Sequence, residues 1–209
     1  MGKFQFPSPT SILHSASYSS INPTQQSVSL AGKTVIITGG GAGIGLAISK
    51  SIAQAGAKTL IILGRRTSVL DAAGTEIDSQ SGNTTKVIAI SADITKKTEV
   101  DGAFAKISEL LPGVKPDILV TNSGAFTGLR LLGTETVEEW QNAFNVNVLG
   151  LYLVTVDFIA AAKEDATIIN ISSGIAHLDP FPGFSSYGTT KMAGAKLMQY
   201  FQGSIPGFT

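Results

Sequence analysis

The chain has 209 residues, which is enough for one domain with a substantial hydrophobic core but too few for two full domains. Its formal net charge is zero and only 14% of its residues are charged, so the composition argues against a basic surface for nucleic acid. The absence of cysteine excludes disulfides, thiolate catalysis and cysteine-ligated zinc, and two histidines argue against a histidine-based metal site.

The first segment, residues 1–31, is rich in Ser, Pro and Gln and lacks the continuous apolar stretch of a secretory signal. We expect it to form a flexible arm that precedes a single domain at residues 32–209. The longest apolar stretch, 146–162, is interrupted by polar residues and falls short of the roughly 20 residues that span a bilayer. The sequence therefore predicts a soluble, cytoplasmic protein with no membrane partner.

From Lys33 onward, short β-branched runs alternate with longer segments of helical periodicity. This alternation is typical of parallel strands joined by crossover helices and predicts an α/β fold. In chain order, the expected strands cover residues 34–38, 59–63, 86–90, 117–121 and 167–171. The expected helices cover residues 44–55, 68–80, 99–111, 137–162 and 186–201.

A glycine-rich segment follows the first expected strand, with Thr38, Gly39, Gly43, Ile44 and Gly45 in the order T-G-x-x-x-G-I-G. Glycines permit the tight turn from strand to helix, and the missing Cβ atoms let the backbone approach a pyrophosphate closely. The free N–H groups at the start of the next helix would face the phosphates. A glycine-rich turn without a ligand is the alternative, but the flanking strand and helix favour a nucleotide site.

This glycine spacing resembles that of the short-chain dehydrogenase/reductase family, in particular its fungal-type NADP(H)-dependent members. The resemblance extends from Lys33 to about Gln202. It implies a three-layer Rossmann-like fold whose parallel sheet has the strand order 3-2-1-4-5. The family continues with further strands and a substrate lid, so the resemblance also implies a chain truncated at its C-terminus.

The second expected strand ends in Leu63-Gly64-Arg65-Arg66, with glycine where an NAD-binding protein would place an acidic residue for the ribose hydroxyls. A carboxylate there would repel a 2′-phosphate, whereas a guanidinium can bind it through charge-assisted hydrogen bonds. The sequence therefore favours NADP(H), with Arg65 as the first candidate and Arg66 as the second. Surface arginines without a ligand are the alternative.

The resemblance assigns further cofactor contacts to the loops after the third and fourth expected strands. Asp93 corresponds to the family's acid that hydrogen-bonds the adenine amino group, although an Asp that caps a helix is an alternative. Asn122 and Gly124 correspond to the family's N-A-G loop, with Ser123 in place of alanine. Both loops follow the carboxyl ends of strands, where open α/β sheets bind their ligands.

Tyr187 and Lys191 are four residues apart at the start of the last expected helix, a spacing that places both side chains on one helix face. A phenol is a poor acid or base at neutral pH, and a neighbouring cation stabilises its anion. The pair can therefore move a proton while a hydride moves. A chance pair of surface residues is the alternative, but the position after the fifth strand favours a catalytic pair.

The resemblance adds a serine and an asparagine to this pair. Ser173, fourteen residues before Tyr187, corresponds to the family's catalytic serine, which hydrogen-bonds the substrate oxygen, with Ser172 as the reserve candidate. Asn147 corresponds to the asparagine of the family's N-x-x-G motif, which helps hold a water that connects the lysine to solvent. Without the resemblance, Asn147 reads as a polar residue satisfied within a helix.

The resemblance implies reversible hydride transfer between NADP(H) and the carbonyl or secondary alcohol of a small organic substrate, a type of reaction found in secondary metabolism. Tyr187 would protonate the substrate oxygen, Ser173 would hold it, and Lys191 would bind the nicotinamide ribose. A homo-oligomer formed through the long helices is a further expectation. The alternatives are an inactive nucleotide-binding relative or assembly partner, and, more distantly, a nucleotide-dependent lyase or epimerase.

Overall fold

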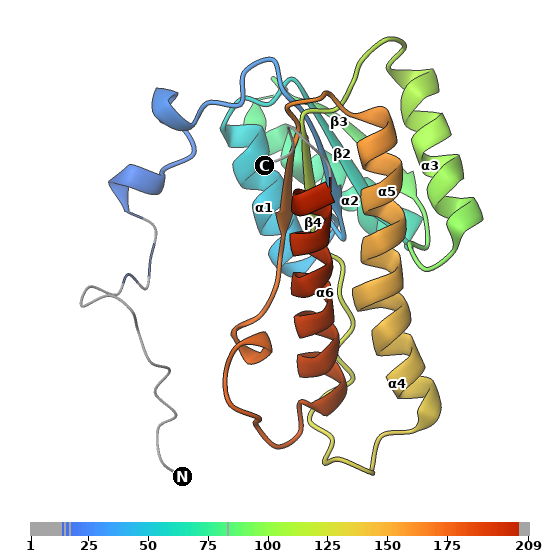
Figure 1. Cartoon of the computed structure of the whole chain (residues 1–209). Coiled ribbons are helices and arrows are strands. Elements are labelled where there is room, and N and C mark those ends of the chain that lie inside the picture. The colour runs from blue at the N-terminus through green and yellow to red at the C-terminus, as the bar shows by residue number, and fades with distance from the viewer. Residues whose placement is uncertain (1–13, 15, 17, 83, 205–209) are drawn as a thin grey trace.

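The structure, a computed structural model, describes residues 14, 16, 18–82 and 84–204. Its centre is a parallel sheet of five strands in the order β3-β2-β1-β4-β5, which confirms the expected order (Figure 1). The strands are β1 (Thr34–Thr38), β2 (Thr59–Gly64), β3 (Lys86–Ser91), β4 (Ile118–Thr121) and β5 (Thr167–Asn170). The helices of the domain are α1 (Gly43–Gln54), α2 (Thr67–Ser81), α3 (Lys97–Leu110), α4 (Val137–Phe144), η3 (Asn145–Gly150), α5 (Leu151–Ala161), η4 (Gly174–Ala176) and α6 (Ser185–Ser204).

Strand β1 lies at the centre of the sheet, paired with β2 on one side and β4 on the other, and all five of its residues are buried. Because side chains alternate across a strand, Val35 and Ile37 belong to one hydrophobic core and Ile36 to the other. Burial on both faces explains why the strand reads as a continuous apolar run rather than an alternating one. Because β1 is fixed in the core, the start of the glycine-rich turn that follows it is fixed as well.

Helices cover both faces of the sheet, as expected for a three-layer fold (Figure 1). On one face, Ile52 of α1 and Ile77 of α2 pack against the sheet. On the other face, Phe104 of α3 and Phe158 of α5 do so, and Phe158 is fully buried. Helix α6 lies beside α4 and η3, which brings its first turn toward the carboxyl edge of the sheet.

The long helix expected at 137–162 is continuous but not uniform, since a π-helical turn, η3, separates α4 from α5. Its start is fixed by a capping box, in which the Thr136 side chain accepts from the Glu139 N–H and the Glu139 side chain accepts from the Thr136 N–H. π-Turns inside α-helices frequently occur at functional sites. This one carries Asn147.

By length and composition alone, the helical segment Val137–Ala161 is long and apolar enough to cross a membrane. The expectation that no segment reaches this length is therefore wrong. The helix is a layer of the fold all the same, because Val154 and Phe158 are buried in the core against the sheet. Core helices of soluble proteins commonly meet the same criteria, so the finding is weak evidence for a membrane span.

The limits of the other elements differ from the expected ones by at most three residues, the largest difference being at the end of α6, which continues to Ser204 rather than residue 201. Helix α3 begins at Lys97 rather than at residue 99, and β4 begins at Ile118, one residue later than expected. The arm expected at 1–31 falls partly outside the described residues. Its described part contains two short 3₁₀ helices, η1 (Ser19–Ile21) and η2 (Gln26–Val28), and the Leu30 N–H donates to the carbonyl of Ala55.

Candidate active site

The glycine-rich turn connects β1 to α1 in the manner the sequence predicts. Gly39 and Gly43 have φ angles of 67° and 53°, a left-handed conformation that glycine adopts without strain. At Gly45, a Cβ atom would lie 2.1 Å from the carbonyl oxygen of Gly39. The turn and the first turn of α1 are thus packed so closely that no side chain fits between them.

The β4 loop holds the glycine-rich turn in place through hydrogen bonds to Thr38 and Gly39. The Thr38 hydroxyl accepts from the backbone N–H groups of Asn122 and Ser123, each at 3.0 Å. The Asn122 amide nitrogen donates to the carbonyl of Thr38 at 3.0 Å and to that of Gly39 at 3.4 Å. Asn122 therefore holds the glycine-rich turn in place by hydrogen bonds to the backbone of that turn.

A cavity of about 590 Å³ lies at the carboxyl edge of the sheet, where open α/β sheets bind ligands. It is lined by nine of the expected site residues, namely Gly39, Ile44, Gly45, Arg65, Asp93, Asn122, Gly124, Tyr187 and Lys191. Four others do not line it, namely Thr38, Gly43, Asn147 and Ser173. Thr38 and Asn147 do not line the cavity themselves but accept hydrogen bonds from Asn122 and Ala125, which do line it.

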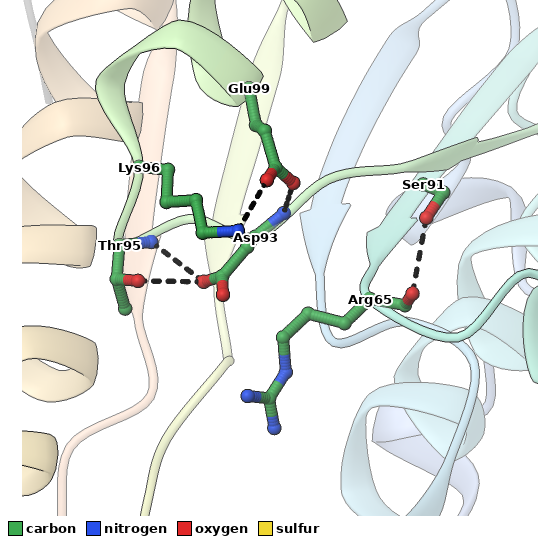
Figure 2. A network of polar contacts seen from close by, with 6 residues as sticks. All are labelled: Arg65, Ser91, Asp93, Thr95, Lys96 and Glu99. Atoms are coloured by element: carbon green, nitrogen blue, oxygen red, sulfur yellow. Dashed lines mark hydrogen bonds and ion pairs between the residues drawn. The ribbon is translucent and has the colours of Figure 1, made fainter.

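Arg65 and Asp93 both line the cavity, and Figure 2 shows the polar contacts around them. The carboxylate of Asp93 accepts from the N–H and the hydroxyl of Thr95, at 3.0 and 2.8 Å, and the Asp93 N–H donates to Glu99. Burial alone would raise the pKa of Asp93, but these bonds from Thr95, with the cations of Arg65 and Lys96, hold it below its usual value. Asp93 thus stays ionised.

Figure 2 also shows which polar atoms of Arg65 and Asp93 have no bond to the other residues drawn. The second carboxylate oxygen of Asp93 has no contact with the other residues drawn, nor does the Arg65 guanidinium, which is exposed. The main chain of Arg65 is fixed, because its carbonyl accepts from the Ser91 hydroxyl at 3.1 Å. The exposed guanidinium of Arg65 and one carboxylate oxygen of Asp93 therefore belong to residues that line the same cavity.

Tyr187 and Lys191 also line the cavity and lie on the first turns of α6. The Lys191 ammonium is 5.7 Å from the centroid of the Tyr187 ring and donates to the carbonyl of Ile171 at 2.8 Å. Lys191 is 9% exposed, and burial lowers the pKa of its amine. The tyrosine ring packs against Phe126, with centroids 5.1 Å apart.

Asn147 occupies the π-helical turn and is 4% exposed. Its carbonyl oxygen accepts from the Ala125 N–H at 2.7 Å, and its amide donates to the Ala125 carbonyl at 2.9 Å and to the Thr190 hydroxyl at 3.0 Å. It therefore connects the β4 loop to the α6 residue next to Lys191. The reading of Asn147 as a residue satisfied within its own helix is wrong, because all these partners are on other segments.

The two serines after β5 have different surroundings. Ser172 lines the cavity, but its hydroxyl is buried and finds no hydrogen-bond partner among the described residues. Ser173 is half-buried, does not line the cavity, and occupies the N-cap position of the short helix η4 without a side-chain capping bond; η4 packs against α6. The expected catalytic serine thus lies beside the cavity rather than in its wall.

Several cavity residues were not foreseen from the sequence, among them Phe126, Thr127, Asn142 and Val146. Phe126 and Thr127 directly follow the expected Asn122–Ala125 loop, and the continuation of that loop along the same edge is the signal that could have identified them. No group of three or more His, Cys, Asp or Glu side chains that could hold a metal ion occurs among the described residues.

Comparison with known proteins gives a consistent result. A sequence model of the family described as short chain dehydrogenase matches residues 33–205. The chain is 33% identical over 193 residues to the short chain dehydrogenase tazN of Aspergillus terreus, covering 90% of this chain and 41% of the relative. It is 32% identical over 194 residues to a short chain dehydrogenase/reductase of Claviceps purpurea, covering 93% of this chain and 63% of the relative. The chain thus spans from two fifths to just over three fifths of the length of these relatives.

Two solved structures resemble the fold and were determined with an NADP-type cofactor. An alcohol dehydrogenase from the archaeon Thermococcus sibiricus, complexed with 5-hydroxy-NADP, has a TM-score of 0.77 and 26% identity, covering 84% of this chain and 73% of that one. A short chain dehydrogenase from Burkholderia cenocepacia J2315, in complex with NADP, has a TM-score of 0.76 and 29% identity, covering 86% and 72%.

Proposed function

Because the chain belongs to the short-chain dehydrogenase family, we propose that it is an NADP(H)-dependent oxidoreductase acting on the carbonyl or secondary alcohol of a small organic substrate. One observation carries this proposal: Tyr187 and Lys191 line the same cavity as the glycine-rich turn and Arg65. A proton donor and a dinucleotide cradle in one cavity are what carbonyl reduction by a nicotinamide requires. A role in secondary metabolism remains a prediction from the resemblance.

The residues of the cavity fit a dinucleotide. The close approach of Gly45 to Gly39 leaves backbone N–H groups, rather than side chains, at the start of α1, where phosphates bind favourably. The free guanidinium of Arg65 suits a 2′-phosphate, and the free oxygen of Asp93 suits the adenine amino group. When bound, NADPH supplies the hydride.

In the reductive direction, the chain's own groups hold the substrate and move one proton. The Tyr187 hydroxyl gives its proton to the carbonyl oxygen. Ser173, which lies beside the cavity rather than in its wall, must bring its hydroxyl into the cavity to donate the hydrogen bond that holds this oxygen. The Lys191 ammonium, which donates to the Ile171 carbonyl, would hold the nicotinamide ribose, and its charge favours the phenolate left on Tyr187. The apolar ring of Phe126 beside Tyr187 reduces the access of water to the proton-transfer step.

The proposal is tested by incubating the purified protein with NADPH and a panel of ketones and following the absorbance of the reduced nicotinamide. A melting curve is recorded with each cofactor in parallel. Turnover that depends on NADPH supports the proposal. Stabilisation by NADP⁺ without turnover of any ketone would leave a nucleotide-binding protein and contradict the enzyme assignment.

Replacing Arg65 by Ala should weaken NADP⁺ binding by about tenfold to a hundredfold, because charge-assisted hydrogen bonds to the 2′-phosphate are lost. The affinity for NAD⁺, which lacks this phosphate, should change little. Titration of each cofactor, followed by tryptophan or nicotinamide fluorescence, measures both constants, with Arg66→Ala as the matched variant. An equal loss for both cofactors, or tighter binding of NAD⁺ by the unaltered protein, would refute the role of Arg65.

Replacing Ser173 by Ala should lower kcat by about a hundredfold, because a donor to the charge that develops on the substrate oxygen disappears. Ser172→Ala should change kcat only a few-fold, since the Ser172 hydroxyl is buried and a substrate cannot reach it without rearrangement. Steady-state kinetics of both variants decide between the serines. A larger effect at Ser172 would transfer the oxygen-binding role to that residue.

We also propose that two copies of the chain associate through the long helices. Large apolar side chains are exposed along this surface, among them Leu149, Tyr152, Met192 and Tyr200. Contiguous exposed apolar residues on several helices commonly mark a protein–protein interface. The cytoplasmic location stays a prediction.

A further inference from the structure

Glu135 lies directly before the first residues of α4, yet its carboxylate contacts the start of α6, fifty residues further along the chain. The Ser185 hydroxyl donates to one carboxylate oxygen at 2.7 Å, and the Ser186 hydroxyl donates to the other. The Thr127 hydroxyl, from the wall of the cavity, donates to the same carboxylate at 3.3 Å. Three hydroxyl groups from two segments thus converge on Glu135.

This carboxylate is charged and suited to its place. Burial alone would raise the pKa of Glu135, but hydrogen bonds from Ser186, Ser185 and Thr127 outweigh it and hold the pKa below its usual value. A helix start carries unpaired N–H groups and a partial positive charge, which an anion stabilises. Helix α6 has no acidic residue of its own in its first turn. Glu135 therefore supplies, from another segment, the negative charge that this helix start favours.

The residue that follows the two serines is Tyr187. The loop that carries Glu135 also touches this region elsewhere, because the Arg130 N–H donates to the Gly183 carbonyl at 3.1 Å and Phe126 packs on the Tyr187 ring. One loop therefore contacts the turn before α6, the first residues of α6 and the tyrosine itself. Among these contacts, only Glu135 engages both serines that precede Tyr187.

We propose that Glu135 is a positioning residue, which acts through Ser185 and Ser186 to fix the start of α6 and so the place of the Tyr187 hydroxyl in the cavity. This inference rests on the proposed function, since it requires Tyr187 to be the proton donor. Among the described residues, the side-chain hydrogen-bond partners of Glu135 are Thr127, Ser185 and Ser186, none of which is assigned to nucleotide binding. Its loss should therefore affect the proton-transfer step and spare cofactor affinity.

The test compares Glu135→Ala, Glu135→Gln and Glu138→Ala with the unaltered protein. Glu138 is exposed, lies three residues further on, and makes the same change of charge without contacting α6. Glu135→Ala should lower kcat by about tenfold to a hundredfold, as small displacements of a catalytic group do, with the KM for NADPH and the Kd of NADP⁺ changed less than about twofold. Glu135→Gln keeps one acceptor oxygen for the serines but loses the charge, so it should recover part of kcat, and Glu138→Ala should resemble the unaltered protein.

The outcomes separate this inference from the proposed function. No turnover by the unaltered protein would overturn the proposed function, and the positioning role with it. Normal turnover with an unaffected Glu135→Ala variant, or a parallel fall in kcat and cofactor affinity that Gln does not rescue, would overturn the positioning role alone. If Glu135→Ala does not fold, Ser185→Ala combined with Ser186→Ala removes the two side-chain hydrogen bonds between Glu135 and α6 and should lower kcat to a similar extent. An unchanged kcat in that double variant would equally contradict the role.

Discussion

Replacing Tyr187 by Phe should lower kcat by about a thousandfold, the largest effect expected at any single position. The change removes only the hydroxyl that gives its proton to the substrate, whereas the ring and its contact with Phe126 remain. The melting temperature and the Kd of NADP⁺ should therefore stay close to those of the unaltered protein. Steady-state kinetics measures kcat, thermal unfolding measures the melting temperature, and a cofactor titration measures the Kd of NADP⁺.

Tyr200→Phe is the matched control, because Tyr200 lies on the same helix, is 65% exposed and is not among the residues that line the cavity. Loss of the Tyr200 hydroxyl should leave kcat unchanged. Turnover retained in Tyr187→Phe would refute the role of Tyr187 in proton transfer. It would leave the assignment of the cofactor site untouched.

Replacing Gly45 by Ala should abolish measurable cofactor binding and destabilise the fold by several kcal/mol, as overpacking against an immobile backbone does. The new Cβ would meet the Gly39 carbonyl at 2.1 Å and the Asn122 amide at 2.5 Å, so the turn and the β4 loop would both have to move. Thermal unfolding and NADP⁺ titration measure the change in stability and in affinity.

Gly102→Ala provides the comparison for a glycine in a helix without such a constraint. Gly102 lies inside α3, where an added Cβ meets nothing within 4 Å. Because alanine favours a helix over glycine by about 1 kcal/mol, this variant should be as stable as the original or more so. Equal behaviour of the two variants would show that the close approach at Gly45 is not a constraint in solution.

The fold could be predicted from local patterns because those patterns are strong and repeated. The buried run of β1, the glycines before α1 and the periodicity of α5 each specify an element without reference to distant residues. The limits of elements were less predictable, since Lys97 has no feature that distinguishes a helix start from the preceding loop. The π-helical turn was not foreseen, because it depends on contacts between Asn147 and other segments.

The candidate site was predictable where chemistry and spacing coincide and not where tertiary contacts decide. Tyr187 and Lys191 are held on one helix face by their spacing alone, and both line the cavity. The serines follow the end of β5 at Asn170, beyond which alternation no longer determines the direction of a side chain. Glu135 carries no local signal for its contacts, because its partners on α6 are about fifty residues away.

The central claim is that the cavity transfers a hydride between NADP(H) and a carbonyl carbon, and isotope transfer tests it most directly. The protein is incubated with a ketone and with NADPH that is deuterated at the transferable position of the nicotinamide. The alcohol product is then examined by mass spectrometry and NMR. We expect one deuterium at the carbinol carbon, with product formed about a thousandfold more slowly when Tyr187 is replaced by Phe. Bound cofactor without any alcohol, or an alcohol that carries no deuterium at that carbon, would contradict it.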